Sequence, residues 1–373
     1  MGQLPENSID LIQNEEDVDN FDLMSDLSKD LRGRLNELSS VNLPDIISEN
    51  HSKDGTIKWL FSSGIGQAIE TVYIPEKERG TLCISSQVGC ALDCSFCATG
   101  FQGFNRNLST AEIIGQVCYA NRALPRRKND LPAISNVVFM GMGEPLANYK
   151  NVIKALKMLL ADNAYGLSRR RVTLSTSGIV PNLEALGDDC NVSLAVSLHA
   201  SNDELRNKLV PINKIHPIND LLDVCWAYAK KQSNRYVTFE YVMLRDINDS
   251  IPQAKELASL LKGKPAKINL IPFNPFNGSD YERSPVDRIR RFQSKLRELG
   301  IIVTTRKTRG DDIDAACGQL AGKVKNRVLK ISKGDNFESD IQKIENEYEF
   351  LEENQSQRQE AQAWESSKFS EVP

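Results

Sequence analysis

Three cysteines stand close together in the chain, Cys90, Cys94 and Cys97, in a CxxxCxxC pattern. Three thiolates at this spacing can wrap one face of an iron–sulfur cubane. Each then binds one iron of a [4Fe–4S] cluster, and the fourth iron has no protein ligand. An open iron can bind and activate a small molecule, whereas a structural cluster or zinc site normally has four protein ligands. The alternatives are three buried free cysteines, or a zinc site that Cys83 completes.

Two further cysteines have a context that suggests chemistry. Cys83 lies seven residues before Cys90, and Cys317 lies in the segment RGDDIDAACGQL, downstream of a basic run at 306–309. Nearby cations and a helix start favour the thiolate form of a cysteine. Isolated cysteines are usually inert buried residues, and we interpret the remaining three in this way: Cys118, Cys190 and Cys225.

Glycines and polar residues follow several strand-like segments. Glycine lets the backbone approach a ligand closely, and a carboxylate can accept a hydrogen bond from an ammonium group. These features predict ligand contacts at the strand ends, and the candidates are Gly143, Glu144, Ser175, Ser197, His199 and Asn274.

The elements that must position these residues alternate between strand and helix from residue 80 onward. Strand patterns cover 81–85, 136–140, 171–175, 192–198, 236–244, 267–271 and 301–305, and helical patterns cover 110–124, 149–162, 217–231, 250–262 and 285–299. Apolar strands separated by helices indicate a parallel sheet. We therefore predict an α/β fold with a partial (β/α) barrel, and a doubly wound open sheet is the alternative. In a barrel, chemistry occurs at the C-terminal strand ends.

Residues 21–79 predict a small N-terminal α+β accessory domain. The stretch FDLMSDLSKDLRGRL has helical periodicity, and TIKWLF and QAIETVYI are strand-like runs joined by the hairpin signal SSGIG. The predicted organisation is an acidic tail over 1–20, this accessory domain, a catalytic barrel over 80–330 and a disordered acidic tail over 335–373.

The charge is distributed unevenly along the 373 residues. The net charge is −4, but residues 1–30 and 335–373 each carry −8, so the body between them carries +12. A basic body suits a polyanionic partner such as nucleic acid. Candidate contacts are four basic clusters, at 126–128, 169–171, 288–291 and 323–327. No apolar run is long enough to span a bilayer and the N-terminus has no secretory signal, so we expect a cytoplasmic protein without a membrane partner.

Long motifs around these residues resemble one enzyme family. The segments TLCISSQVGCALDCSFCATGFQGFNRNL, GMGEPLANY, RRVTLSTSG, SLHASND, KINLIPFNPF and RKTRGDDIDAACGQLAG are similar to those of the dual-specificity 23S rRNA/tRNA adenine C2 methyltransferases. These enzymes belong to the radical S-adenosylmethionine (SAM) superfamily. The resemblance extends from about residue 21 to residue 330.

The resemblance implies cofactors and their contacts. It implies one [4Fe–4S] cluster on Cys90, Cys94 and Cys97 and two SAM molecules consumed per turnover. The residues that it implies for SAM contact are Gly143, Glu144, Ser175, Ser197, Leu198, His199 and Asn274. An external electron donor, such as a flavodoxin-type reductant, and a monomeric enzyme are expected.

The resemblance also implies a two-cysteine mechanism. Cys317 takes a methyl group from one SAM, and a radical made from a second SAM abstracts hydrogen from the methylated Cys317. The resulting carbon radical adds to the adenine, and a disulfide between Cys83 and Cys317 releases the product. Glu70 matches a proton acceptor of the family, and its alternative is a solvated strand residue. Direct attack of adenine C2 on SAM is implausible because this carbon is electron-poor.

The implied substrates are adenine 2503 of 23S rRNA and adenine 37 of tRNA. The catalytic motifs do not separate C2 from C8 methylation of adenine, so a C8 methyltransferase remains an alternative. A zinc-bearing RNA-binding module without catalysis is the alternative from another class. A segment of only about twenty residues, rich in acidic side chains, precedes residue 21, so the accessory RNA-binding domain is expected to be truncated compared with the family.

Overall fold

The computed structural model describes residues 20–320, except residues 26, 65 and 233–234. Most of the predicted N-terminal tail and all of the predicted C-terminal tail lie outside the described residues. Within the described part, no helix is both long enough and apolar enough to cross a membrane.

A ten-stranded sheet forms the centre of the fold, in the order β1-β2-β3-β4-β7-β8-β9-β10-β11-β12. Pairing is antiparallel from β1 to β4 and parallel from β4 to β12. The strands are β1 (Ile46–His51), β2 (Ile57–Ser62), β3 (Ala68–Pro75), β4 (Gly80–Cys83), β7 (Asn136–Phe139), β8 (Val172–Thr176), β9 (Ser193–Ser197), β10 (Val237–Met243), β11 (Ala266–Pro272) and β12 (Ile302–Thr305). A separate antiparallel pair consists of β5 (Gln87–Gly89) and β6 (Phe104–Asn107).

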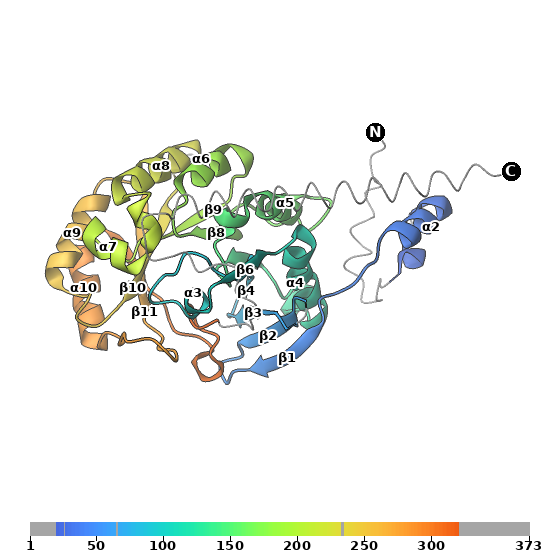
Figure 1. Ribbon diagram of the computed structural model, residues 1–373, viewed down its shortest axis with the longest axis horizontal. Coiled ribbons are helices and arrows are strands. Elements are labelled where there is room, and N and C mark those ends of the chain that lie inside the picture. The colour runs from blue at the N-terminus through green and yellow to red at the C-terminus, as the bar shows by residue number, and fades with distance from the viewer. Residues whose placement is uncertain (1–19, 26, 65, 233–234, 321–373) are drawn as a thin grey trace. The chain divides into compact units, whose positions relative to one another are not determined.

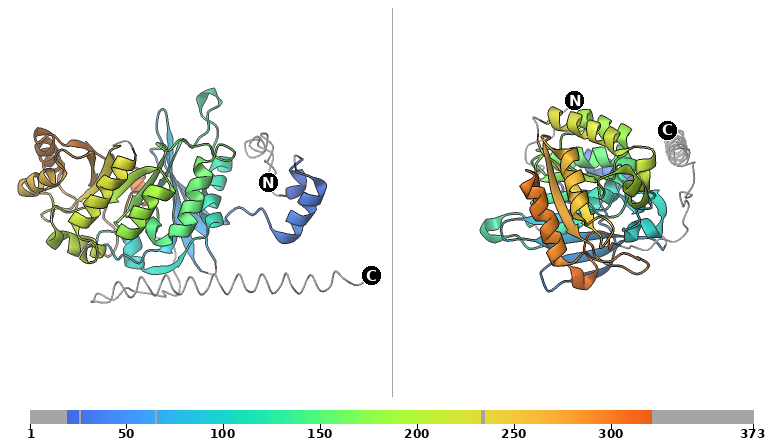
Figure 2. Two further views of the ribbon diagram at one scale, coloured as in Figure 1. Left: turned by 90° about the horizontal axis from the view of Figure 1, so that it is seen from above. Right: turned by 90° about the vertical axis from the view of Figure 1, so that its left-hand side faces the viewer.

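The helices that connect the parallel strands lie outside the curve of the sheet (Figures 1 and 2). They are α4 (Thr110–Ala123), α5 (Tyr149–Leu160), α6 (Val180–Asp189), α7 (Asp203–Leu209), α8 (Ile218–Lys231), α9 (Ile251–Leu261) and α10 (Val286–Glu298). The short helix α3 (Ala98–Gln102) lies between β5 and β6 in the chain. Because the sheet ends in β1 and β12 it is not closed, and the prediction of a partial (β/α) barrel is confirmed.

All seven predicted barrel strands and all five predicted barrel helices are present. Capping boxes at Ser109 and Ser250 fix the starts of α4 and α9. In each box the serine hydroxyl accepts from the backbone N–H three residues later, and the serine N–H donates to the side chain of that later residue. The sequence interpretation missed α6 and α7. Both are short, and α6 begins with Pro181 in its first turn and contains Gly187, so their helical periodicity is weak.

The N-terminal region differs from its prediction. The single helix predicted over 21–35 is wrong: a 3₁₀ turn, η2 (Phe21–Leu23), is followed by α2 (Lys29–Leu38). Ser28 starts α2 by accepting a hydrogen bond from the N–H of Leu31. The hairpin of β2 and β3 is confirmed, and β1 extends it. Because β3 pairs with β4, the hairpin and the barrel share one sheet across the predicted boundary at residue 80.

Candidate active site

A cavity of about 160 Å³ lies at the C-terminal ends of the parallel strands. Cys90, Cys94 and Cys97 line it together with residues from the ends of β7 to β11. Six of the seven residues expected to contact SAM also line it: Gly143, Glu144, Ser175, Ser197, His199 and Asn274. Leu198 is fully buried but is not part of the wall. The structure therefore brings the cysteine motif and the predicted SAM residues into one cavity.

The cluster loop, residues 90–97, connects β5 to α3. The N–H of Cys97 donates to the carbonyl of Cys94 at 3.1 Å, and the N–H of Cys90 donates to the carbonyl of Gly103 at 3.0 Å. Burial raises the pKa of all three thiols, so positive metal is needed to hold them as thiolates. Among the described residues, no three His, Cys, Asp or Glu side chains stand close enough to bind one metal ion. The three cysteines of the motif need not meet at one metal ion, because in a [4Fe–4S] cluster each thiolate binds a different iron.

The glycines after β7 serve packing as well as ligand approach. Gly143 has φ +96°, and a Cβ there would lie 2.5 Å from the Cβ of Gln87. A Cβ on Gly141 would lie 2.6 Å from the carbonyl oxygen of Ile84. The sequence interpretation assigned these glycines to a ligand. The structure shows that they also let the loop after β7 pack against the segment after β4.

Glu144 is held rigidly in the wall of this cavity. Its Oε1 accepts from the Thr176 hydroxyl at 2.7 Å, and its Oε2 accepts from the N–H of Ser177 at 2.7 Å. Burial raises the pKa of Glu144, and these hydrogen bonds act in the opposite direction. The carboxylate retains acceptor capacity for an ammonium group in the cavity.

His199 is both a hydrogen-bonded buried histidine and a cavity residue. Its Nδ1 accepts from the N–H of Val242 at 3.0 Å, so a neutral ring carries its proton on Nε2. Burial lowers the pKa of His199 to about 3, which keeps the ring uncharged at neutral pH. The Phe96 ring packs edge-on against it at a centroid distance of 4.4 Å.

A second, smaller cavity of about 20 Å³ contains both remaining candidate cysteines. Cys83, the last residue of β4, and Cys317 line it together, and Cys317 also lines the larger cavity. Both are free thiols in the structure. Burial raises the pKa of Cys83 to about 12, and the proximity of Cys317 adds to this shift.

The Cys317 loop, residues 311–320, is bonded directly to the segment that follows Cys97. The N–H of Ala98 donates to the carbonyl of Gly318 at 2.8 Å, and the Thr99 hydroxyl donates to the carbonyl of Leu320 at 2.7 Å. The Asn274 side-chain amide donates to the carbonyl of Cys317 at 3.2 Å. Asn274 thus contacts the Cys317 loop as well as the larger cavity. The helix expected after Cys317 lies outside the described residues beyond the 3₁₀ turn η6 (Asp311–Ile313).

Glu70 is a buried residue of β3, with 7% of its surface exposed, so its alternative as a solvated strand residue is wrong. It forms an ion pair with Lys58 at 3.1 Å, and Lys58 also donates to the carbonyl of Asp314 in the Cys317 loop. Val72 is paired directly with Cys83 across β3 and β4. Since side chains two residues apart share a face, Glu70 lies on the same face of the sheet as Cys83.

The sequence interpretation named Arg306 only as part of the basic run near Cys317, and it missed Glu240. Arg306, directly after β12, lines both cavities, and its pKa is raised by the charge of Cys317 and, more weakly, of Glu240. Glu240 is buried in β10 and accepts from the Asn269 amide at 2.8 Å. The sequence feature that could have indicated Glu240 was its position as the single carboxylate within the apolar strand YVTFEYVML.

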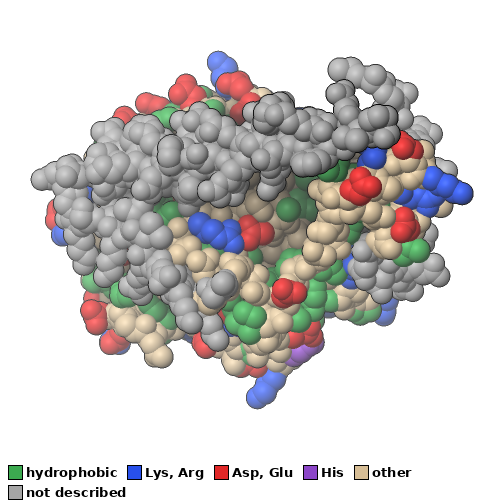
Figure 3. All heavy atoms as spheres, turned by 45° about the vertical axis from the view of Figure 1, so that its right-hand side comes forward, with side chains coloured by type: hydrophobic (Ala, Val, Ile, Leu, Met, Phe, Trp, Pro, Cys, Tyr) green, Lys and Arg blue, Asp and Glu red, His purple; other side chains and the backbone are tan. Residues whose placement is uncertain are grey.

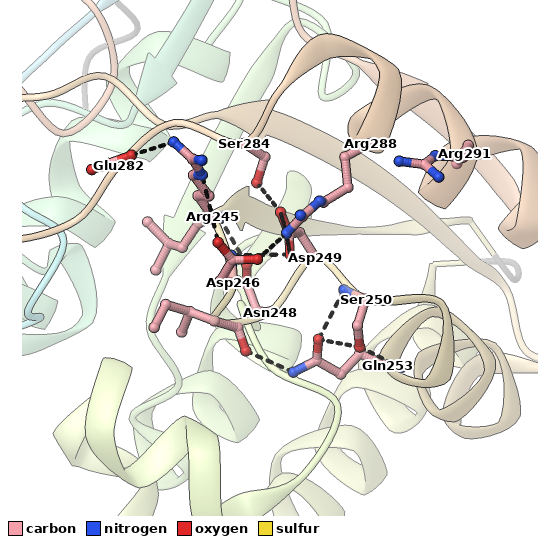
Figure 4. A network of polar contacts seen from close by, with 12 residues as sticks. Arg245, Asp246, Asn248, Asp249, Ser250, Gln253, Glu282, Ser284, Arg288 and Arg291 are labelled. Carbon is pink, nitrogen blue, oxygen red and sulfur yellow. Dashed lines mark hydrogen bonds and ion pairs between the residues drawn. The ribbon is translucent and has the colours of Figure 1, made fainter.

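The structure does not bring the predicted basic clusters together. The clusters at 126–128 and 169–171 precede β7 and β8, at the opposite ends of the strands from the cavity. Arg288 lies on the cavity side but is paired with Asp246 and Asp249 in a polar network (Figure 4). The cluster at 323–327 lies outside the described residues. On the face drawn in Figure 3, acidic and basic side chains are interspersed.

Comparison with known proteins agrees with this geometry. Residues 84–258 match the Radical SAM superfamily. A solved structure described as a radical SAM methyltransferase from Sphaerobacter thermophilus is 42% identical to this chain, with a TM-score of 0.77. That alignment covers 84% of this chain and 92% of the other. A domain of pyruvate-formate lyase-activating enzyme from Bacteroides vulgatus matches at 16% identity and a TM-score of 0.37, covering 46% of this chain and 99% of that one. On the strength of the first alignment and of the superfamily match, the chain belongs to the radical SAM methyltransferases.

Proposed function

We propose that this enzyme methylates C2 of adenine in 23S rRNA and tRNA, with Cys317 as the methyl carrier and Cys83 as the residue that releases the product. One observation carries the proposal. Cys317 lies at the junction of two cavities, one shared with Cys90, Cys94 and Cys97 and the other shared with Cys83. A methyl carrier must meet SAM on one side and its resolving thiol on the other, and this position allows both.

The residues present fit the cofactors of the superfamily. Cys90, Cys94 and Cys97 would hold a [4Fe–4S] cluster at one end of the larger cavity. Glu144, whose carboxylate is fixed by Thr176 and Ser177, would accept from the SAM ammonium group. When bound, the cluster supplies the electron for reductive cleavage of SAM. We expect that electron to come from an external donor of the flavodoxin type.

The two thiols have separate tasks in this proposal. The sulfur of Cys317 would attack the methyl group of one SAM, with S-adenosylhomocysteine as the leaving group. After a 5′-deoxyadenosyl radical from a second SAM takes a hydrogen atom from this methyl group, the methylene carbon would bond to adenine C2, and the unpaired electron of the adduct would return to the oxidised cluster. The adenine proton passes to a base, for which Glu70 is the candidate because it lies on the sheet face of Cys83. The thiolate of Cys83 then attacks the sulfur of Cys317, a disulfide replaces the bond between Cys317 and the methylene carbon, and that carbon takes up a proton to become the methyl group of the product.

The RNA partner is supported by the +12 charge of residues 31–334 and by the family motifs. The fold adds a restriction, because two of the four predicted basic clusters lie at the strand ends opposite the cavity. Contacts with RNA phosphates are therefore expected from basic residues on the cavity side, such as Arg290 or Lys307, rather than from 126–128 or 169–171.

The proposal is tested with Cys317→Ala, Cys83→Ala and a control, Cys118→Ala, whose thiol lies outside both cavities. Reconstituted proteins are incubated with SAM, reductant and RNA. Cys317→Ala should acquire no methyl group and leave the RNA unmodified. Cys83→Ala should acquire the methyl group and then stall as a protein–RNA crosslink that survives denaturing electrophoresis. Cys118→Ala should turn over normally.

Nucleoside analysis by mass spectrometry against C2- and C8-methyladenosine standards distinguishes the two possible products. Normal turnover of Cys83→Ala without a crosslink would contradict the two-cysteine mechanism. A C8 product would leave that mechanism intact and replace only the methylated position. If neither the parent nor any variant modified RNA, the assignment of RNA as the substrate would be wrong.

A further inference from the structure

Arg206, on α7, is a fully buried cation whose surface is 0% exposed. Its guanidinium is surrounded by neutral acceptors. Nε donates to the carbonyl of Leu198 at 3.2 Å, and Nη2 donates to the carbonyls of Ser177 and Ser197 at 2.7 and 2.9 Å. Nη1 donates to the side-chain oxygen of Asn213 at 2.8 Å. These contacts provide acceptors for the N–H groups of the guanidinium, but they do not neutralise its positive charge.

No Asp or Glu of the described residues lies within ion-pair distance of Arg206. Asp203 is connected to it only through Asn213, whose amide donates to the Asp203 carboxylate at 2.8 Å. A buried charge without a counter-charge is strongly unfavourable. Burial lowers the pKa of Arg206 to about 10, so the side chain remains charged at neutral pH. An anion that completes the site would offset this cost.

The negative charge expected nearby belongs to the cluster loop. Ser177 connects the two, because its carbonyl accepts from Arg206 and the residue lines the larger cavity together with Cys94. Helix α7 also contacts the loop directly, since the N–H of Ser95 donates to the carbonyl of Leu209 at 3.2 Å.

Arg206 is not part of the cavity wall, so it does not touch SAM or RNA. Arg206 can therefore affect the cluster only through its positive charge and through the carbonyls of Ser177 and Ser197, to which it donates. A [4Fe–4S] cluster with three thiolates is negatively charged and becomes more negative when it accepts an electron. Net charge and hydrogen bonding around a cluster set its reduction potential.

We propose that Arg206 is the counter-charge of the iron–sulfur cluster and raises its reduction potential by stabilising the reduced form. The inference depends on the cluster assignment to Cys90, Cys94 and Cys97, and it does not depend on the RNA substrate. It predicts that removing the charge, and not merely altering the hydrogen bonds, makes the cluster harder to reduce.

The test is a potentiometric titration followed by electron paramagnetic resonance, on anaerobically reconstituted full-length protein without SAM or RNA. Dithionite supplies the single electron. Arg206→Gln should lower the ratio of reduced to oxidised cluster about tenfold at the parent's midpoint, which for one electron corresponds to about 59 mV. Arg206→Lys keeps the charge and should stay within about threefold, although lost hydrogen bonds lower its melting temperature. The control Lys208→Gln removes an exposed charge from the same helix and should change the ratio less than twofold.

A second neutralising variant keeps the test valid if Arg206→Gln does not retain iron. The double variant Asp203→Asn/Asn213→Asp exchanges a carboxylate and an amide, so that Arg206 gains a direct counter-ion while the net charge is unchanged. It should lower the ratio as Arg206→Gln does. An unchanged midpoint in an iron-replete neutralised variant would overturn the proposal. So would a shift in Arg206→Lys as large as that in Arg206→Gln.

Discussion

The two loops that meet in the active site are held in place by different means. The cluster loop, residues 90–97, is bonded within its own backbone, as between Cys97 and Cys94, and through the single residue Ser95 to the distant residues Leu209 and Tyr281. The Cys317 loop is fixed mainly by side chains from distant parts of the chain. Asp312 accepts from the Ser52 hydroxyl at 2.6 Å and from the N–H of Lys53, and Lys58 donates to the carbonyl of Asp314.

This difference suits the proposed tasks of the two loops. A cluster site must stay closed around its irons, and a loop that is bonded within its own backbone and anchored through Ser95 has few ways to open. Cys317 must reach SAM, an adenine and Cys83 in turn. Individual hydrogen bonds of about 0.5–1.5 kcal/mol each can be released separately. Damage to the cluster loop should therefore abolish function, whereas damage to the Cys317 loop should reduce it in steps.

The largest effect is expected from Cys94→Ala. Loss of one of three thiolates should remove most of the iron and all reductive cleavage of SAM, because one further iron of the cluster then lacks its thiolate ligand. Iron content and 5′-deoxyadenosine formation are the measurements, with Cys225→Ala as a buried control outside the cavity. Full iron and full cleavage in Cys94→Ala would show that the cluster is bound elsewhere.

Lys58→Met should have the next largest effect, because it removes the ammonium group that is paired with the buried carboxylate of Glu70. Removing one member of a buried ion pair costs about 3–5 kcal/mol. The free energy of unfolding from urea titration should fall by about 3 kcal/mol, less the share that solvent screens at this partly accessible pair. The double variant Lys58→Met/Glu70→Leu should recover much of the loss. A double variant as unstable as the single would show that the pair is not responsible.

Asn274→Ala should give a graded defect on the Cys317 side. The substitution removes the hydrogen bond to the carbonyl of Cys317, and misplacement of a reacting group costs about 10²-fold in rate. We expect methylation of Cys317 to slow by about tenfold to a hundredfold, with iron content unchanged. Thr99→Val, which breaks the bond to Leu320, should act in the same direction. Loss of iron in Asn274→Ala would show that the two loops are not separable.

The smallest effect concerns Asp54, which ties the β1–β2 turn to Gly310. Burial alone would raise the pKa of Asp54, but hydrogen bonds from Thr56, Ser52 and Gly310 lower it to about 2. A lowered carboxylate pKa contributes stability that is present above about pH 4 and is lost as the pH falls toward 2. Because the side chain is partly exposed, we expect only about 1 kcal/mol after allowance for screening.

Urea titrations of parent and Asp54→Asn protein at pH 6 and pH 3 measure this contribution. The two proteins should differ most at pH 6, and the difference should be about half as large at pH 3. Equal stability at both pH values would show that Asp54 does not hold the turn.

The sequence predicted much of the barrel, and six of the seven residues that it proposed for SAM contact line one cavity. The seven barrel strands are recognisable because runs buried on both faces are apolar throughout, and the long helices are recognisable by their periodicity. The weak elements were missed or misplaced: α6 and α7 are short, and the polar residues between Met24 and Ser28 divide the N-terminal helix. Cys90, Cys94 and Cys97 could be assigned to one site because their spacing is local.

Only the tertiary structure decided which distant residues meet. That Cys317 lies between the cluster cysteines and Cys83 depends on the curvature of the sheet, which brings the end of β4 and the chain after β12 to one cavity. The burial of Glu70 against Lys58 likewise depends on packing between separate segments. The same holds for the burial of Arg206 against the carbonyls of Ser177 and Ser197. Local periodicity records which face of an element is buried, but it does not record against which partner, because that choice is made when the whole sheet assembles.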